Sequence, residues 1–181
     1  MLLAFAGLAV AGKATAIGIF ERIGFGRRFY AGQVLRDEVE RRGLALTPQN
    51  EREIRTNLRD QRGMDVFARL AYPSLSEIIC SGPVLLDAIY CVEERDFYRD
   101  SFDTSLQVLA IGASRETRAD RLATRKERPI GTDDLACRDA LELGQYRLAD
   151  VTSSADHIID NESSLSQFEE ILRGLIPLLS S

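Results

Sequence analysis

The sequence predicts an α/β fold in which a doubly wound, parallel five-stranded sheet is flanked by helices. Short apolar runs recur along the chain, as expected for strands buried on both faces. Helical patterns separate these runs, and such alternation favours a parallel sheet. A glycine-rich turn ending in lysine follows the first run. The 181 residues, 45% of them hydrophobic, are enough for one domain with a sizeable core.

The first strand is expected at residues 2–6 (LLAFA), ending at Gly7, with a helix from about Lys13 to Ile23. The other strands are expected at 28–31, 83–87, 106–111 and 155–159. The remaining helices are expected at 32–42, 48–61, 64–79 with an interruption at Pro73, 92–101, 114–128, 133–148 and 164–179. Thr47 followed by Pro48 and the Ser164-x-x-Gln167 capping box mark two helix starts.

The helical stretch between Ala31 and Gly82 is too long for a simple crossover. We therefore expect a helical insert, at about 32–80, that covers a ligand at the carboxyl ends of the strands. A small lid is expected at about 125–135, around Pro129-Ile130-Gly131.

Charge and cysteine content narrow the function classes. A net charge of −5 and a pI near 5.0 argue against a nucleic-acid-binding or membrane-surface protein. The cysteines, Cys80, Cys91 and Cys137, are odd in number and have no CxxC spacing, which predicts a cytoplasmic protein whose cysteines pack as small apolar residues. The apolar start lacks a basic leader and contains Lys13, so a buried strand is favoured over a signal peptide. Oligomeric state stays open.

The segment Gly7-Leu-Ala-Val-Ala-Gly12-Lys13 has the Walker A frame of two glycines followed by lysine, between a strand and a helix. Backbone N–H groups of such a loop surround a polyphosphate, and the lysine offsets its charge. The alternative is a plain small-residue turn. Ala14 replaces the usual Mg²⁺-binding hydroxyl, although Thr15 follows. Val10 would be strained if the loop required a positive φ.

The loop and the following segment resemble adenylate kinases, dephospho-CoA kinases and, most closely, archaeal adenylate-kinase-related proteins. Gly12-Lys13-Ala14-Thr15 is similar to the Gly-Lys-Gly-Thr of adenylate kinases. Gly32-Gln33-Val34-Leu35-Arg36 is similar to Gly-Asp-x-x-Arg at the start of the acceptor region, and Leu58-Arg59 to a later Leu-Arg segment.

Three later segments extend the resemblance over nearly the whole chain. Leu85-Leu86-Asp87 matches an apolar-apolar-Asp strand end, and Arg138-Asp139-x-x-Glu142-Leu143 matches Arg-Asp-x-x-Glu-Leu. Residues 155–161 and the Ser163-Ser164-Leu165 turn resemble the last strand and turn of dephospho-CoA kinases, near the donor base.

The resemblance implies an ATP-dependent kinase that uses Mg²⁺, with ATP or another triphosphate as donor and a nucleoside monophosphate or related nucleotide as acceptor. It implies catalytic roles for Lys13, Asp87 and Arg138. The residues implied to bind the donor are Gly7, Ala11, Gly12, Lys13, Ala14, Thr15, Arg125 and Asn161. Those implied to bind the acceptor are Gln33, Arg36, Arg59 and Tyr90, and those implied to hold the metal are Thr15 and Asp87.

Two other functions stay open. Tyr90 and Gln33 stand where the family has arginine and aspartate, and Val10 stands where phosphate loops often have glycine. These three departures are compatible with a catalytically weak or inactive nucleotide-binding sensor or partner protein. A dephospho-CoA-kinase-like enzyme, acting on a ribose hydroxyl, is the other alternative.

Some residues have equally plain structural interpretations. Arg118, Arg121, Arg125 and Arg128 line one helix face, either toward the lid or as a solvated face paired with Glu116, Asp120 and Glu127. His157 is expected in the core or at a sheet edge, and Asp133-Asp134 as a helix cap.

Overall fold

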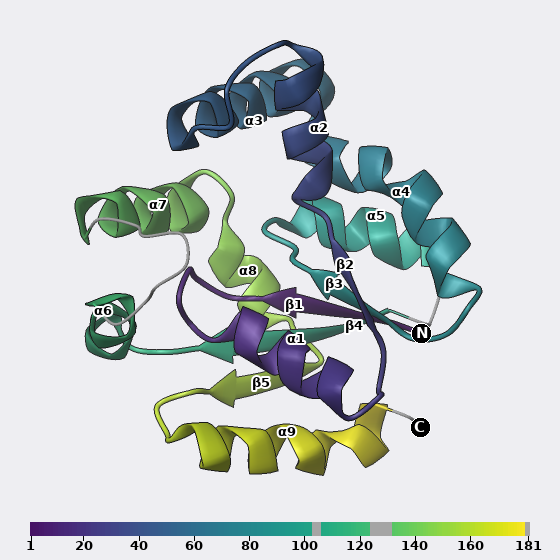
Figure 1. Ribbon diagram of the computed structural model, residues 1–181, viewed down its shortest axis with the longest axis vertical. Helices are drawn as coiled ribbons and strands as arrows, with labels where there is room; N and C mark the ends of the chain where they lie inside the picture. Colours follow the sequence, from purple (N-terminus) through teal and green to yellow (C-terminus); the bar gives the residue numbers. More distant parts are fainter. Residues whose placement is uncertain (103–105, 124–131, 180–181) are drawn as a thin grey trace.

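The computed structural model describes residues 1–102, 106–123 and 132–179. Within them, the strands are β1 (Leu2–Ala6), β2 (Arg27–Tyr30), β3 (Val84–Asp87), β4 (Leu106–Gly112) and β5 (His157–Asp160). They form one parallel sheet in the order β2-β3-β1-β4-β5 (Figure 1). The helices are α1 (Lys13–Arg22), α2 (Gln33–Arg41), α3 (Pro48–Arg62), α4 (Val66–Ile79), α5 (Val92–Phe102), α6 (Arg115–Ala123), α7 (Thr132–Gly144), α8 (Leu148–Ser153) and α9 (Leu165–Leu179). The predicted fold class is confirmed.

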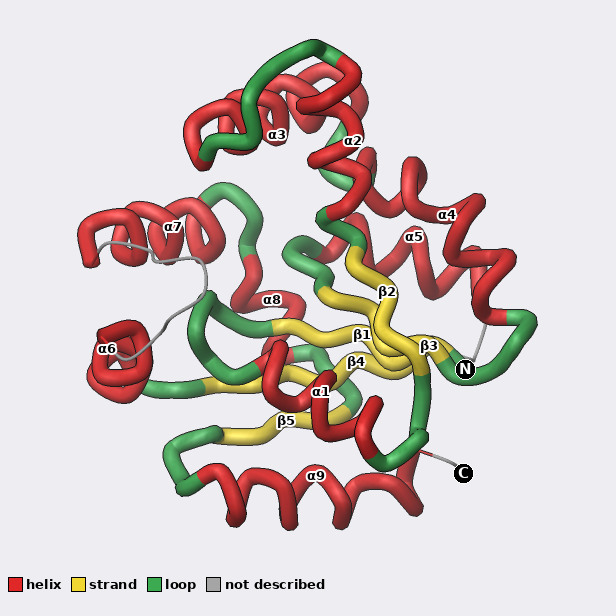
Figure 2. Tube along the Cα trace, in the orientation of Figure 1, coloured by secondary structure: helices red, strands yellow, loops and turns green. Residues whose placement is uncertain are grey.

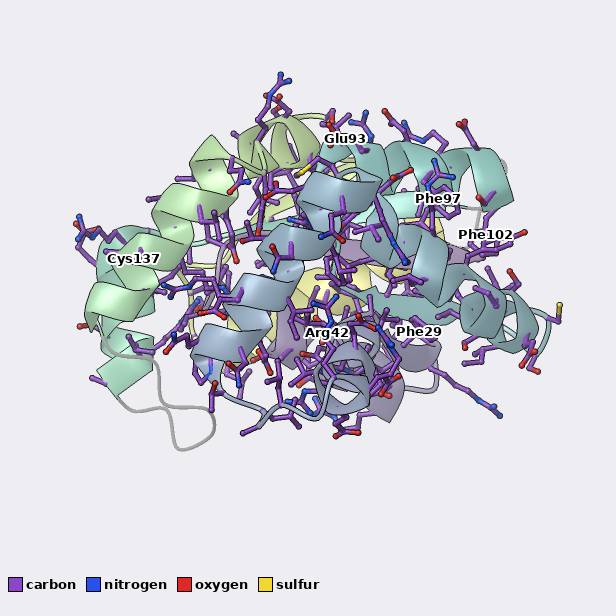
Figure 3. The ribbon with its side chains drawn as sticks, turned by 90° about the horizontal axis from the view of Figure 1, so that it is seen from above. Phe29, Arg42, Glu93, Phe97, Phe102 and Cys137 are labelled. Atoms are coloured by element: carbon purple, nitrogen blue, oxygen red, sulfur yellow. The ribbon has the colours of Figure 1, made fainter. Side chains whose placement is uncertain are left out.

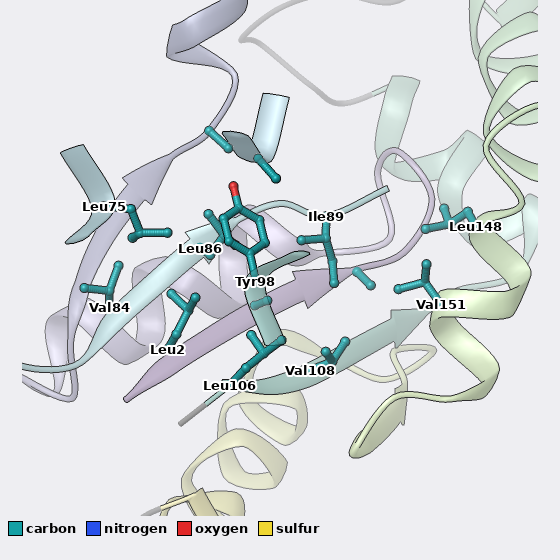
Figure 4. Close-up of a cluster of buried hydrophobic side chains, with 14 residues drawn as sticks. Leu2, Leu75, Val84, Leu86, Ile89, Tyr98, Leu106, Val108, Leu148 and Val151 are labelled. Carbon is teal, nitrogen blue, oxygen red and sulfur yellow. The ribbon is translucent and has the colours of Figure 1, made fainter. Parts of the chain in front are cut away.

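The central strand β1 is buried on both faces because helices cover the sheet on each side (Figure 2). Leu3 and Phe5 pack in a cluster with side chains of α1 and α9. Leu2, Ala4 and Ala6 point the other way, into a cluster with α4, α5 and α8 (Figure 4). The period of two along the strand therefore feeds two separate cores.

Helices α2 and α3 stand away from the sheet and share a small apolar cluster with the start of α4 (Figure 1). Leu35 and Val39 of α2 pack there with Ile54 and Leu58 of α3. Further along, Leu75 of α4 returns to the sheet. This arrangement brings α3 to the carboxyl ends of the strands.

Element boundaries follow the predictions, with two corrections. Pro73 lies on the exposed side of α4, and the helix continues through it without interruption. The single helix expected at 133–148 is instead two helices, because the chain turns after Gly144 and Arg147 adopts a left-handed φ of 52°. The predicted lid and the end of the helix expected at 114–128 fall largely outside the described residues.

Both predicted helix starts are confirmed. The N–H of Asn50 donates to Oγ1 of Thr47 at 3.2 Å. In the capping box, the N–H of Gln167 donates to Oγ of Ser164 at 3.4 Å, and the N–H of Ser164 donates to Oε1 of Gln167 at 3.2 Å.

The expected packing of the cysteines is correct only for Cys91, which is buried; Cys80 and Cys137 are exposed, the latter on α7 (Figure 3). His157 lies half-buried on the edge strand β5, near Gln107. None of the helices in the described ranges is long and apolar enough to cross a membrane.

Candidate functional site

A cavity of about 660 Å³ lies at the carboxyl ends of β1, β2 and β3, with α3 and α7 contributing to its walls. Its described lining includes six basic side chains, Lys13, Arg28, Arg55, Arg59, Arg121 and Arg138. It also includes four acidic side chains, Glu51, Asp87, Glu94 and Glu142. A protein of net charge −5 thus concentrates positive charge in this cavity, which suits an anionic ligand.

The loop after β1 has the backbone that the glycine pattern predicts. Gly7 has a φ of 136°, and a Cβ there would lie 2.2 Å from the carbonyl oxygen of Ile111. Gly12 has a φ of 116°, and its Cβ would lie 2.3 Å from Nδ2 of Asn161. Val10 also has a positive φ, 66°, so the loop does impose the strain that the sequence suggested for a β-branched residue.

Lys13, the first residue of α1, is half-buried and folds back over the loop. Its Nζ donates to the carbonyl oxygen of Leu8 at 2.9 Å and to that of Gly7. Burial lowers the pKa of this ammonium from 10.5 to about 8, against the opposing pull of nearby Glu142. The lysine is therefore held at the loop, and an anion bound there would stabilise its charged form.

Side chains from distant elements fix the shape of the loop. Buried Asn161, after β5, donates from Nδ2 to the carbonyl oxygen of Ala11 at 2.9 Å. Arg121 of α6 donates to the carbonyl oxygens of Ala11 and Asn161 at 3.3 and 2.8 Å. Asn161 and Ala11, both predicted at the donor site, are thus in contact.

Arg118 is buried and is not part of a solvated helix face. Its buried guanidinium donates to both carboxylate oxygens of Asp139 on α7, at 2.9 and 2.7 Å, and to the carbonyl oxygen of Ala9 at 3.3 Å. For Arg118, the acidic partner is therefore Asp139 on α7 and not Glu116 or Asp120 on its own helix. Arg125, predicted at the donor site, and Arg128 lie outside the described residues.

Asp87 ends β3 and lines the cavity together with Ala14 and Thr15. Carboxylate and hydroxyl oxygens are donors that suit Mg²⁺, so these two predicted metal residues are chemically compatible with it. However, Nε and Nη2 of Arg28 both donate to Oδ2 of Asp87. Across the described residues, no three acidic, histidine or cysteine side chains gather as a metal site. Any Mg²⁺ here would rely largely on ligand phosphates and water.

Arg138, Glu142 and Tyr90 meet on another wall of the cavity. Nε of Arg138 donates to Oε1 of Glu142 at 2.6 Å, and Nη2 donates to the hydroxyl of Tyr90 at 3.4 Å. Burial raises the pKa of Tyr90 to about 12, so its hydroxyl is neutral. Arg138 therefore stands beside the neutral hydroxyl of Tyr90.

Arg59 lies deeper and is 4% exposed. Its Nη2 donates to Oε1 of Glu94 at 2.6 Å, and its guanidinium stacks on Tyr146, 3.9 Å from the ring centroid. The N–H of Tyr90 donates to Oε2 of the same glutamate at 2.8 Å. Nε and Nη1 of Arg59 find no partner among the described atoms. Glu94 neutralises the charge of the Arg59 guanidinium. What Arg59 can offer a ligand is therefore its two unpaired N–H groups, Nε and Nη1, and not net positive charge.

Gln33 and Arg36 are not part of the cavity lining that the described residues form. Nε2 of Gln33 donates to Oδ1 of Asp37 at 2.8 Å, and the Arg36 guanidinium lies 5.6 Å from the ring centroid of Tyr30. Arg55 of α3 does line the cavity, and sequence reasoning missed it. Its spacing of four from Arg59 places both on one helix face and could have revealed it.

A glycine-bounded loop with its lysine at the end of the central strand, beneath helices α2 and α3, defines a fold of the P-loop kinase type. Solved structures agree. A gluconokinase of Sinorhizobium meliloti has a TM-score of 0.61 at 15% identity, over 98% of this chain and 91% of that one. A shikimate kinase of Bacteroides thetaiotaomicron has a TM-score of 0.61 at 17% identity, over 100% and 99%. TT1252 of Thermus thermophilus reaches 0.68 at 14% identity, over 100% and 98%.

The chain belongs to the UPF0200 family. It is 34% identical over 173 residues to a UPF0200 protein of Pyrobaculum aerophilum, covering 93% of this chain and 92% of that protein. A UPF0200/UPF0201 protein of Archaeoglobus fulgidus is 29% identical over 181 residues, but the alignment covers 97% of this chain and 54% of that protein, so the chain spans about half its length. No protein-family model matches the chain.

Proposed function

We propose that this protein binds a nucleoside triphosphate at the loop 7–13 and transfers its terminal phosphate to a nucleoside monophosphate or a related phosphorylated nucleoside. The observation that carries the proposal is the continuity of the cavity. Lys13 at the phosphate loop and Arg55 on the insert line the same space, so donor and acceptor can share it. Phosphoryl transfer needs alignment and positive charge more than a protein nucleophile.

In this reaction an acceptor oxygen attacks the terminal phosphorus while the bond to the bridging oxygen breaks, leaving a nucleoside diphosphate. Lys13 and Arg138 offset charge on the moving group. Asp87 and Thr15 would hold Mg²⁺, which supplies charge at the bridging phosphates when it is bound. Asn161 and Arg121 fix the loop carbonyl of Ala11 by donating hydrogen bonds to it.

At the acceptor end, Arg55 is the cation available for an anionic group. It is half-buried, lines the cavity and forms no ion pair within 4.0 Å among the described residues. Arg59 and Tyr90 face the same space and would contact the rest of the acceptor. Arg36 would need the insert to move before it could bind a phosphate, and its role as an acceptor residue stays a prediction.

The second candidate is a nucleotide-binding protein with little or no transfer activity. The observations favouring it are the strained Val10 in the loop and the pairing of Asp87 with Arg28. A third candidate, transfer to a ribose hydroxyl as in dephospho-CoA kinases, differs in needing a carboxylate such as Asp87 to accept the hydroxyl proton.

A product screen separates the three. Purified protein is incubated with each triphosphate against nucleoside monophosphates and dephospho-CoA, and phosphorylated products are detected directly. Formation of nucleoside diphosphates from a monophosphate supports the proposal. Binding without any product supports the second candidate, and product from dephospho-CoA alone supports the third.

Variants of α3 then assign the acceptor end. Arg55→Ala should weaken monophosphate binding about tenfold while leaving triphosphate affinity unchanged, because one charge-assisted contact is lost. Arg52→Ala, an exposed arginine on the same helix outside the cavity lining, is the matched control. Arg36→Ala tests the sequence-based assignment in the same assay. An equal loss for both ligands in Arg55→Ala would count against its acceptor role.

A further inference from the structure

Arg28, whose guanidinium is permanently charged, is paired with Asp87, the carboxylate proposed to hold the metal. Nε of Arg28 donates to Oδ2 of Asp87 at 3.1 Å, and Nη2 donates to the same oxygen. The Asp87 side chain is 12% exposed and that of Arg28 is 40% exposed. Both residues line the cavity. The pair is therefore at the site and reachable by a ligand.

The sheet register explains why the two side chains meet. In the parallel pair of β2 and β3, Arg28 lies opposite Leu85 and Tyr30 lies opposite Asp87. Residues two apart share a face of a strand, so Arg28 and Asp87 are diagonal neighbours on one face. The N–H of Arg28 also donates to Oε1 of Glu21 on α1 at 3.2 Å. Backbone geometry thus brings this arginine to the end of β3.

We propose that Arg28 sets the metal dependence of the site, because its guanidinium occupies Asp87 and competes there with Mg²⁺. The proposal rests on the proposed function in one respect, that Mg²⁺ would enter the site together with a bound triphosphate. A guanidinium stays charged at every accessible pH, so it must be displaced from Asp87 or remain beside the metal and repel it. Wild-type protein is then expected to bind a triphosphate nearly as well without Mg²⁺ as with it.

The competing explanation is a structural ion pair that fastens the edge strand β2 to β3. An ion pair with one partner exposed to solvent contributes little to stability, and losing a purely structural pair should not change how the protein responds to a metal. The two explanations therefore differ in Mg²⁺ dependence and not in folding. Arg28 is also exposed enough for its substitution to leave the fold intact.

The test compares triphosphate affinity, by calorimetry, in excess Mg²⁺ and in chelator. Arg28→Gln should raise the ratio of the two affinities about tenfold, because Asp87 is then free for the metal. Arg27→Gln is the matched control, since Arg27 is exposed on the same strand and outside the cavity lining. An unchanged ratio in Arg28→Gln would overturn the proposal.

A second experiment uses no nucleotide, so that competition between Arg28 and the metal is tested even if the proposed function is wrong. Mn²⁺ is titrated into nucleotide-free protein, and paramagnetic broadening of the Ala88 and Ile89 amide signals is followed by NMR. Arg28→Gln should broaden these signals at about tenfold lower Mn²⁺ than wild type or Arg27→Gln. Equal broadening in all three proteins would contradict competition at Asp87, whether or not a triphosphate binds.

Discussion

The protonation of Lys13 should be coupled to nucleotide binding. In the nucleotide-free protein, burial lowers the pKa of this ammonium to about 8. A polyphosphate in the loop would place negative charge beside it and raise that pKa above the ordinary value. Binding should therefore take up a proton over the range between the two pKa values.

The size of the effect follows from the pKa. With a free-state value of about 8 and a complex in which Lys13 is fully protonated, uptake should be about 0.1 proton at pH 7, about 0.5 at pH 8 and about 0.9 at pH 9. By linkage, triphosphate affinity should fall as pH rises through 8, approaching about tenfold per unit above it. The unfolded chain keeps the ordinary lysine pKa, so this group makes the nucleotide-free protein more stable as pH rises from about 8 to 10.5.

The sequence offers a clean assay, because Lys13 and Lys126 are the only two lysines. A Lys126→Arg protein labelled with ¹³C-lysine gives one lysine ε-carbon signal, whose pH titration is followed by NMR with and without ATP. The expected midpoint is about 8 in free protein and above 10 with ATP. A free-protein midpoint at the ordinary lysine value, or a midpoint lowered by ATP, would refute this reasoning.

Other substitutions test the loop, the buried pair and the acceptor end. Val10→Gly should be more stable to denaturant than Val10→Ala by about 1 kcal/mol, the reverse of the usual order, because both lose the same packing and only glycine relieves the positive φ. Arg59→Met should lower the free energy of unfolding by about 3 kcal/mol, because Glu94 is then left buried without a partner. The double variant Arg59→Met/Glu94→Gln should recover part of this loss. Additive losses from the two substitutions would contradict the pairing. In a steady-state assay with AMP, Tyr90→Arg should raise turnover about tenfold by adding a bidentate phosphate contact. Gln33→Asp should leave turnover unchanged, because Gln33 lies outside the described cavity lining. The opposite order would show that helices α2 and α3 rearrange on binding.

The fold was predictable because its signals are local. The apolar run at 2–6 needs cover on both faces, the glycines bracket a strand-to-helix turn, and Thr47 and Ser164 mark helix starts by their own side chains. The sheet class follows from the alternation of such segments. Even the strain at Val10 was visible, since a β-branched residue in a phosphate loop is unusual whatever surrounds it.

The electrostatic partners in the site were not predictable, because they depend on contacts between distant residues. Arg28 reaches Asp87 across 59 positions, and Arg59 reaches Glu94 across 35. Sequence reasoning assigned Asp87 to a metal and Arg59 to the acceptor, and it named neither of their partners. Likewise, Arg118 finds its acidic partner on α7 instead of on its own helix.

The most direct test of the account is a calorimetric titration of wild-type protein and Lys13→Ala with ATP, paired with their unfolding temperatures. Wild type should show saturable one-site binding, and ATP at about 100 times its dissociation constant should add about 2.7 kcal/mol to the free energy of unfolding. Lys13→Ala should bind at least about tenfold more weakly while the nucleotide-free protein stays folded. Equal binding by both proteins, or no triphosphate binding by wild type, would contradict the assignment of residues 7–13 as the nucleotide site.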